Sequence, residues 1–147
     1  MTLKEEIMNA TTEQHKALSR RALGEIDRGN VDIMDELVAP GATFRFPGAP
    51  PMDLASFKGF VKMFHSSFPD FRHDLENLIA EGDKVVRIGT FRGTHKGDFM
   101  GIPATGNRVE MAFAAVDTFH DGKLVGIQVV PDMMGLMQQI GAVPAAG

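Results

Sequence analysis

The chain contains no cysteine, no tryptophan and no tyrosine among its 147 residues. Without cysteine it can form no disulfide, present no thiolate nucleophile and build no cysteine-ligated metal site. Without tyrosine, an oxyanion hole built on a phenol group is excluded. If the protein catalysed a reaction that forms an enolate, the negative charge would have to be stabilised by Arg87, a histidine, Gln128 or water.

Strong charge and long apolar runs are also missing. The net charge is −4, and no block of lysine and arginine is present that could neutralise nucleic-acid phosphates. No apolar run approaches the length of a membrane span, and the amino-terminal residues are charged where a signal peptide would be apolar. We therefore expect a cytoplasmic protein with neither nucleic acid nor membrane as a partner.

The composition is that of an ordinary globular domain. Hydrophobic residues make up 44% of the chain and charged residues 23%, which is enough apolar surface for one core. The length fits a single domain, residues 1–147, and the sequence shows no internal repeats. The carboxyl-terminal VPAAG, residues 143–147, is predicted to be frayed.

Three helical segments are predicted before residue 68. Thr2 and Glu5 form a candidate capping box and a second candidate lies farther along, so the segment to Arg28 is one long helix or two pieces. A short helix follows Asn30, and a third begins after Asp53. The third helix has apolar residues at helical spacing and should pack on a sheet: Phe57, Phe60, Val61 and Phe64.

After Pro69 the hydrophobic pattern changes to the alternation typical of strands. A turn at Asp121-Gly122 predicts a hairpin, because glycine adopts positive φ at no steric cost. Helices followed by consecutive antiparallel strands predict an α+β fold with helices on one face of a curled sheet. A short strand at 42–46 precedes the predicted strands, which are 71–80, 84–94, 107–120 and 123–130.

Five motifs carry a resemblance to a known family. They are FPDF (68–71), LIAEGDKVV (78–86), GTHKGDFMGIPATGN (93–107), DGKL (121–124) and DMMGLMQQIG (132–141). In this order and spacing they resemble the SnoaL-like polyketide cyclases of the ketosteroid isomerase and nuclear transport factor superfamily. The resemblance implies a cone-shaped α+β barrel, a curved and mainly antiparallel sheet around a pocket. It also implies a homodimer that needs no metal or cofactor and acts on small, mostly apolar molecules.

One departure from the family pattern concerns its chemistry. Cyclases of this family typically carry an acid in the strand after DGK, often preceded by histidine in a tetrapeptide like EHWD. The matching tetrapeptide here is GIQV, so the acid position falls on Val129 and the histidine position on Ile127. The usual cyclase mechanism therefore cannot be transferred to this chain. The resemblance implies the same pocket with a more apolar wall.

Asp117 is the first candidate for catalysis. It is the only ionisable member of an alternating row on strand 107–120 that also holds Met111, Phe113, Ala115 and Phe119. A carboxyl group that is poorly solvated by such neighbours holds its proton more readily, so Asp117 could act as a general base. The alternative is structural: Asp117 accepts hydrogen bonds from the hairpin or from Arg87.

Two further residues are candidates for proton transfer or for the rim of the pocket. His73 alternates with Phe71 and Leu75 and could point inward with them, or be a partly exposed strand residue. Asp132 matches an acid that recurs before the last helix in the family, but its position after Pro131 favours the N-cap of 133–140 over a role at the rim. None of the five histidines forms a metal-ligand spacing with an acid, so no metal is expected.

The expected pocket is lined mainly by apolar side chains. Methionines cluster in the carboxyl-terminal half, where their flexible thioethers suit adaptable apolar surfaces, although core packing is the alternative. The predicted substrate-binding residues are Phe60, Phe64, Arg87, Met100, Met111, Phe113, Ile127, Val129 and Met133.

Three functions stay open at this point. The first is a cofactor-independent cyclase or isomerase that uses Asp117 as the base on a small apolar carbonyl compound. The second is a protein of the same fold that binds a small apolar ligand in its pocket without converting it, as Ile127 and Val129 suggest. The third is epoxide hydrolysis, for which only Asp117 and Asp132 could supply two carboxylates flanking a water.

Overall fold

Local hydrogen bonds fix where the helices begin. In the computed structural model, which describes residues 1–144, α1 (Leu3–Asp27) is one helix. Its capping box is formed, with the Glu5 amide donating to the Thr2 hydroxyl and the Thr2 amide to the Glu5 carboxylate. Asp53 caps α3 (Leu54–Ser67) by accepting the Ser56 amide at 2.8 Å, and this bond lowers the pKa of the Asp53 carboxyl.

The strands form one five-stranded sheet in the order β1-β5-β4-β3-β2. Adjacent strands are antiparallel except β1 and β5, which are parallel. A short turn of 3₁₀ helix (Val31–Ile33) and α2 (Met34–Leu37) lead into the sheet, and α4 (Met133–Gln139) follows it. The strands are β1 (Val38–Arg45), β2 (Arg72–Glu81), β3 (Lys84–Thr94), β4 (Arg108–His120) and β5 (Lys123–Pro131).

This arrangement confirms the predicted α+β class. Strand β1 begins earlier than the predicted residue 42, since Pro40 and Gly41 are tolerated at the irregular start of an edge strand. The prediction of a frayed carboxyl end extends over residues 145–147, which lie outside the described part of the chain. No helix within residues 1–144 is long and apolar enough to cross a membrane.

A bulge bends β2 and curls the sheet. The register with β3 shifts between Leu75 and Asn77, so that His73 and Leu75 face inward before the bulge and Leu78 and Ala80 after it. Opposite this bend, a Cβ atom on Gly89 would lie 2.2 Å from the Asp74 carbonyl oxygen. Glycine at 89 is therefore required for the two strands to approach this closely.

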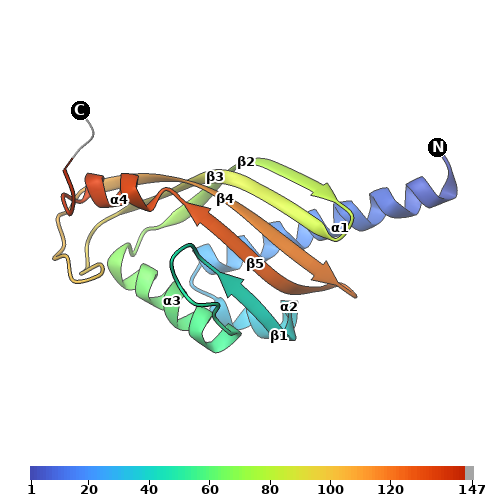
Figure 1. The fold of residues 1–147 in the computed structure, drawn as a ribbon, viewed down its shortest axis with the longest axis horizontal. Helices are drawn as coiled ribbons and strands as arrows, with labels where there is room; N and C mark the ends of the chain where they lie inside the picture. The colour runs from blue at the N-terminus through green and yellow to red at the C-terminus, as the bar shows by residue number, and fades with distance from the viewer. Residues whose placement is uncertain (145–147) are drawn as a thin grey trace.

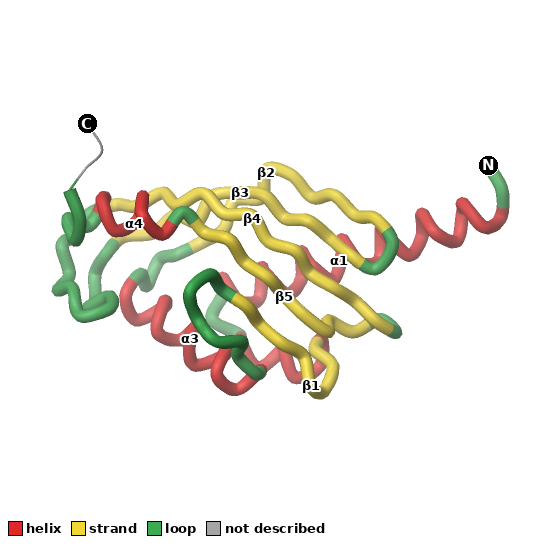
Figure 2. The backbone as a smooth tube through the Cα atoms, viewed as in Figure 1, coloured by secondary structure: helices red, strands yellow, loops and turns green. Residues whose placement is uncertain are grey.

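Both long helices lie on the concave face of the sheet (Figure 1). Helix α1 contacts β2 and β3, α3 contacts β1, and the first turns of α1 extend past the end of the sheet (Figure 2). The core between them is aromatic, with the Phe64 ring 5.3 to 6.1 Å from the rings of Phe68, Phe91 and Phe99.

Two glycine substitutions test the requirement at the bend. Gly89→Ala should destabilise the fold by about 1–3 kcal/mol, because the added methyl group meets backbone that cannot move aside. Gly59→Ala is the matched control, since Gly59 is an exposed position of α3 with open space around it. This second change should stabilise the protein by about 0.4–1 kcal/mol. Urea unfolding measures the free energy of unfolding of both variants. Equal changes of the same sign would contradict the close approach of β2 and β3 at Gly89.

Candidate active site

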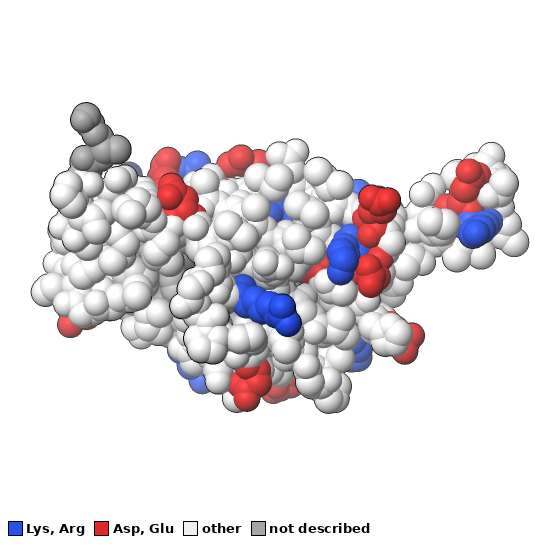
Figure 3. Space-filling model, in the orientation of Figure 1, with Lys and Arg blue, Asp and Glu red and all other residues white. Residues whose placement is uncertain are grey.

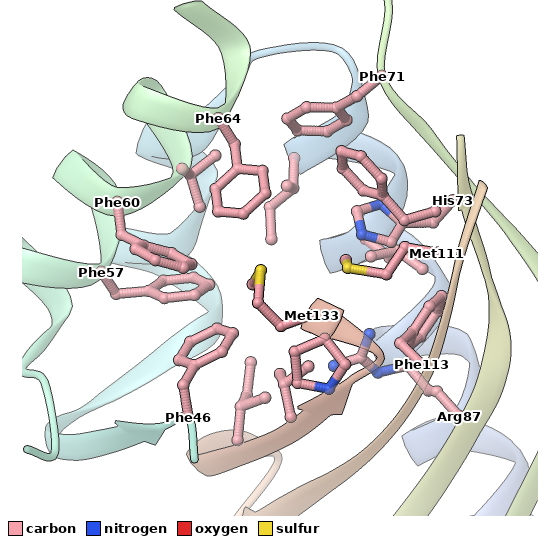
Figure 4. A pocket seen from close by; sticks show the side chains of 17 residues that line it. Phe46, Phe57, Phe60, Phe64, Phe71, His73, Arg87, Met111, Phe113 and Met133 are labelled. Atoms are coloured by element: carbon pink, nitrogen blue, oxygen red, sulfur yellow. The ribbon is translucent and has the colours of Figure 1, made fainter. Parts of the chain in front are cut away.

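A cavity of about 110 Å³ lies between α3, the end of α1 and the concave face of the sheet. Figure 4 shows Phe57, Phe60 and Phe64 of α3 on one side, with His73, Met111 and Phe113 of the sheet across from them. Seven of its lining residues are phenylalanines, so the walls are mainly aromatic. This space is large enough for a small organic molecule, because a single water needs only roughly 10–15 Å³.

Most of the predicted substrate-binding residues line this cavity. Met100 does not: it lies at the tip of the tight turn between Phe99 and Ile102, with a φ of 49° and 68% of its surface exposed. The turn buries Phe99 in the core and directs Met100 outward, which the local pattern did not reveal. The residues that do line the cavity are Phe60, Phe64, Arg87, Met111, Phe113, Ile127, Val129 and Met133.

Within residues 1–144, His73 and Arg87 are the polar side chains that line the cavity. The His73 ring Nδ1 lies 2.6 Å from Oδ1 of Asp27, and its backbone N–H donates to Oδ2 of the same carboxylate at 2.9 Å. The rings of Phe91 and Phe113 pack edge-on against the imidazole at centroid distances of 5.4 and 5.3 Å. Of the two alternatives for His73, the structure shows the inward-pointing one, and the side chain is held by Asp27 and by the two aromatic rings.

Asp27 was not among the predicted site residues. Its partner is 46 positions away in the sequence, and periodicity carries no information about such a contact. One local signal was present: Asp27 ends α1, whose last turn contains no basic residue. A carboxylate at the negative end of a helix is locally unfavourable, which points to a partner elsewhere in the fold.

Arg87 is the second polar side chain in the cavity, and Asp117 holds it. Arg87 Nε donates to Asp117 Oδ2 at 2.8 Å and Nη2 to Oδ1 at 2.9 Å, while Ser19 of α1 donates its hydroxyl to Oδ2 at 2.7 Å. Both charged side chains are almost fully buried, with 7% and 4% of their surfaces exposed. Asp117 engages Nε and one N–H of Nη2, so Nη1 keeps both of its N–H groups for a ligand.

This geometry favours the structural alternative for Asp117. The residue lines a smaller cavity of about 20 Å³ behind Arg87, together with Ser19, and not the aromatic cavity. Both of its carboxylate oxygens accept hydrogen bonds. Asp117 therefore orients Arg87 and has no direct position beside a molecule in the aromatic cavity.

Asp132 is the N-cap of α4. Its carboxylate accepts the Gly135 amide at 3.0 Å, the side chain is exposed, and it does not line the cavity. Its neighbours Pro131 and Met133 do line it. On β5, Ile127 and Val129 also face the cavity, so the wall at these two positions is apolar.

Three other histidines, two buried and one half-buried, have packing positions. His65 Nε2 lies 2.8 Å from the Ile26 carbonyl oxygen, His95 Nδ1 contacts the Thr105 hydroxyl, and His15 stacks on Phe119. Within residues 1–144, no group of three or more His, Asp or Glu side chains is placed to hold a metal ion.

Comparisons with known proteins agree on one family. The model of the SnoaL-like polyketide cyclases matches residues 17–140. AclR from Streptomyces galilaeus, a candidate hydroxylase, has a TM-score of 0.85 and 25% identity, with 92% of this chain and 86% of AclR covered. IdmH from Streptomyces antibioticus, a candidate polyketide cyclase, has a TM-score of 0.77 and 26% identity over 85% of this chain and 96% of IdmH.

A candidate polyketide cyclase from Acidithiobacillus ferrooxidans is 29% identical, with a TM-score of 0.74 and coverage of 95% of this chain and 97% of that protein. No curated protein matches the chain. The family match thus includes the second part of α1, the whole sheet and α4.

The buried ion pair gives a test of stability. Asp117→Asn should lower the free energy of unfolding by about 3–5 kcal/mol, because it leaves the Arg87 charge buried without a counter-charge. The double variant Arg87→Met, Asp117→Leu should recover most of this loss, since it removes both charges. Urea unfolding compares them, with Glu13→Gln in an exposed pair as the control that should change little. A double variant less stable than Asp117→Asn would contradict the explanation that the unpaired Arg87 charge causes the loss of stability.

Proposed function

The chain belongs to the SnoaL-like polyketide cyclase family, and on this basis we propose that it is a cofactor-independent cyclase or isomerase acting on a small apolar carbonyl compound. The observation that carries the proposal is an aromatic cavity with two polar side chains, His73 and Arg87, each held by a carboxylate. Apolar walls with a few convergent polar groups are typical of small-molecule sites.

The two polar groups divide the chemistry between them. The aromatic walls bind the apolar body of the substrate, and the carbonyl oxygen accepts a hydrogen bond from Arg87 Nη1. His73 Nε2, the ring nitrogen not engaged by Asp27, removes a proton from the carbon next to the carbonyl. The negative charge that develops on the oxygen is stabilised by the guanidinium in a site with little water.

The enolate formed in this way has two possible fates. Its carbon can attack a second carbonyl of the same molecule, closing a ring, and the new alkoxide takes the proton from the His73 imidazolium. Alternatively the imidazolium returns the proton to a different carbon, which isomerises the substrate. Both routes restore the neutral imidazole, so a single base serves the whole cycle.

A non-catalytic binding protein is the second candidate function. Ile127 and Val129 favour it, since they form an apolar wall where the resemblance places the acid and histidine of cyclases. Epoxide hydrolysis is not proposed, because it needs two carboxylates flanking a water. Asp117 is engaged with Arg87 and Ser19, Asp132 caps α4, and neither lines the aromatic cavity.

Proton exchange tests the proposal without knowledge of the natural substrate. A panel of apolar ketones and β-ketoesters is incubated with the protein in D₂O, and exchange of the protons next to the carbonyl is followed by NMR. His73→Gln should slow the exchange of an accepted compound by about 10²–10⁴-fold, the usual contribution of a general base. Its binding should change only a few-fold, because the apolar walls are intact.

The control is His120→Gln, since the His120 side chain is 77% exposed and lies outside the cavity. Exchange by this variant should equal that of the parent. A parent protein that binds these compounds and exchanges none of their protons would instead support the binding protein.

We also propose that the chain forms a homodimer through the convex face of its sheet. No helix within residues 1–144 covers this face, and Figure 3 shows a mostly uncharged surface with basic side chains near the centre of the view and a mixed acidic and basic cluster to their right. Ile88 pairs with Ala114, and Ala114 with Val130, which places three apolar side chains in one row across the strands. Ile88 and Val130 are 37% and 53% exposed, and an exposed apolar row of this kind favours association.

The oligomeric state tests this surface. The parent should elute as a dimer in size-exclusion chromatography with light scattering, and Ile88→Glu should be a monomer, since it buries an unpaired charge in the interface. Met100→Glu is the control, because Met100 is exposed but lies in a loop away from the sheet. A monomeric parent, or a dimeric Ile88→Glu, would overturn the proposed interface.

A further inference from the structure

One carboxylate holds both the backbone and the ring of His73. Oδ2 of Asp27 accepts the backbone N–H of His73 at 2.9 Å, and Oδ1 faces ring Nδ1 at 2.6 Å. A carboxylate accepts hydrogen bonds and donates none, so the short contact to Nδ1 requires the ring proton to be on Nδ1. In the neutral imidazole, Nε2 then carries the free lone pair.

We infer that Asp27 is a positioning residue that fixes His73 in its Nδ1–H tautomer and so presents an Nε2 lone pair to the aromatic cavity. The catalytic meaning of this inference rests on the proposed function, in which His73 is the base. Asp27 acts through His73, because it does not line the cavity itself.

The surroundings of the ring support a fixed orientation. Three phenylalanine rings pack edge-on against the imidazole, with centroid distances of 5.6, 5.4 and 5.3 Å to Phe71, Phe91 and Phe113. The side chains of His73 and Asp27 are only 18% and 19% exposed, so water competes little for their hydrogen bond. Strand β2 is an edge strand, and its outward N–H at His73 would lack a partner without Asp27.

Asp27→Asn distinguishes a residue that fixes the tautomer of His73, which we call a tautomer clamp, from one whose hydrogen bonds only connect α1 to β2. An amide has one oxygen acceptor and one NH₂ donor, whereas the carboxylate offers two acceptors. The backbone N–H of His73 is always a donor, so it takes the amide oxygen. The NH₂ group then faces ring Nδ1, which must become the acceptor, and the ring proton moves to Nε2. The substitution should therefore reverse the tautomer and leave no lone pair toward the cavity.

The tautomer can be observed directly. Long-range ¹H–¹⁵N correlation spectra of ¹⁵N-histidine-labelled protein at about pH 8.5, about two units above the ordinary histidine value of about 6.5, show which ring nitrogen carries the proton. The His73 signals are assigned by their loss in His73→Gln. The parent should show a protonated Nδ1 and a bare Nε2, and Asp27→Asn the reverse. Asp53→Asn is the control, because it exchanges the same atoms at the cap of α3 and should leave His73 unchanged.

Three outcomes overturn the inference: an Nε2–H tautomer in the parent, an imidazolium at this pH, or an unchanged tautomer in Asp27→Asn. The first two are read from the parent alone, so a variant that fails to fold does not remove the test. In the exchange assay, Asp27→Asn should lose about as much activity as His73→Gln, up to about 10⁴-fold, as expected when a base is held in the wrong tautomer. A clamp seen by NMR together with no exchange by the parent would refute the proposed function and leave the clamp intact.

Discussion

A charged group can lie inside an apolar cavity only if a counter-charge and hydrogen bonds replace its lost water, and this constraint organises the molecule. Arg87 meets it through two hydrogen bonds to Asp117, which in turn accepts the Ser19 hydroxyl. His73 is a polar side chain and needs a hydrogen-bond partner in the cavity wall, which Asp27 provides. Ser19 and Asp27 both belong to α1, so one helix supports both polar groups of the cavity.

This dependence explains why α1 packs where it does. Among the strands it contacts mainly β2 and β3, which carry His73 and Arg87, and Ser19 reaches Asp117 of β4. A purely apolar helix would cover the same strands, and a buried ion pair adds little stability over well-packed apolar side chains. The polar contacts are therefore better explained by what they present to the cavity, one imidazole nitrogen and one guanidinium edge, than by stability.

Much of the fold could be predicted because its signals are local. The caps at Thr2 and Asp53 and the turn at Asp121-Gly122 are set by neighbouring residues. Helical spacing identified Phe60 and Phe64, and strand alternation Met111 and Phe113, as parts of the cavity wall. Alternation could place Asp117 on the inner face, but it could not tell a free acid from one paired with Arg87. The prediction that Met100 lines the cavity was wrong because of a local feature. A tight turn directs this apolar side chain outward.

Under the proposed function, the departure at Val129 also changes where acid/base chemistry would occur within the cavity. The resemblance places the acid of typical cyclases on the last strand, whereas the polar groups here lie on β2 and β3. In the sheet order β1-β5-β4-β3-β2, β5 and β2 are separated by two strands, so the proposed base faces the cavity from a different wall. A substrate held by the same aromatic residues would then present a different carbon to the base. Loss of the acid on β5 is therefore compatible with retained acid/base chemistry, with its site moved toward the strands that α1 supports.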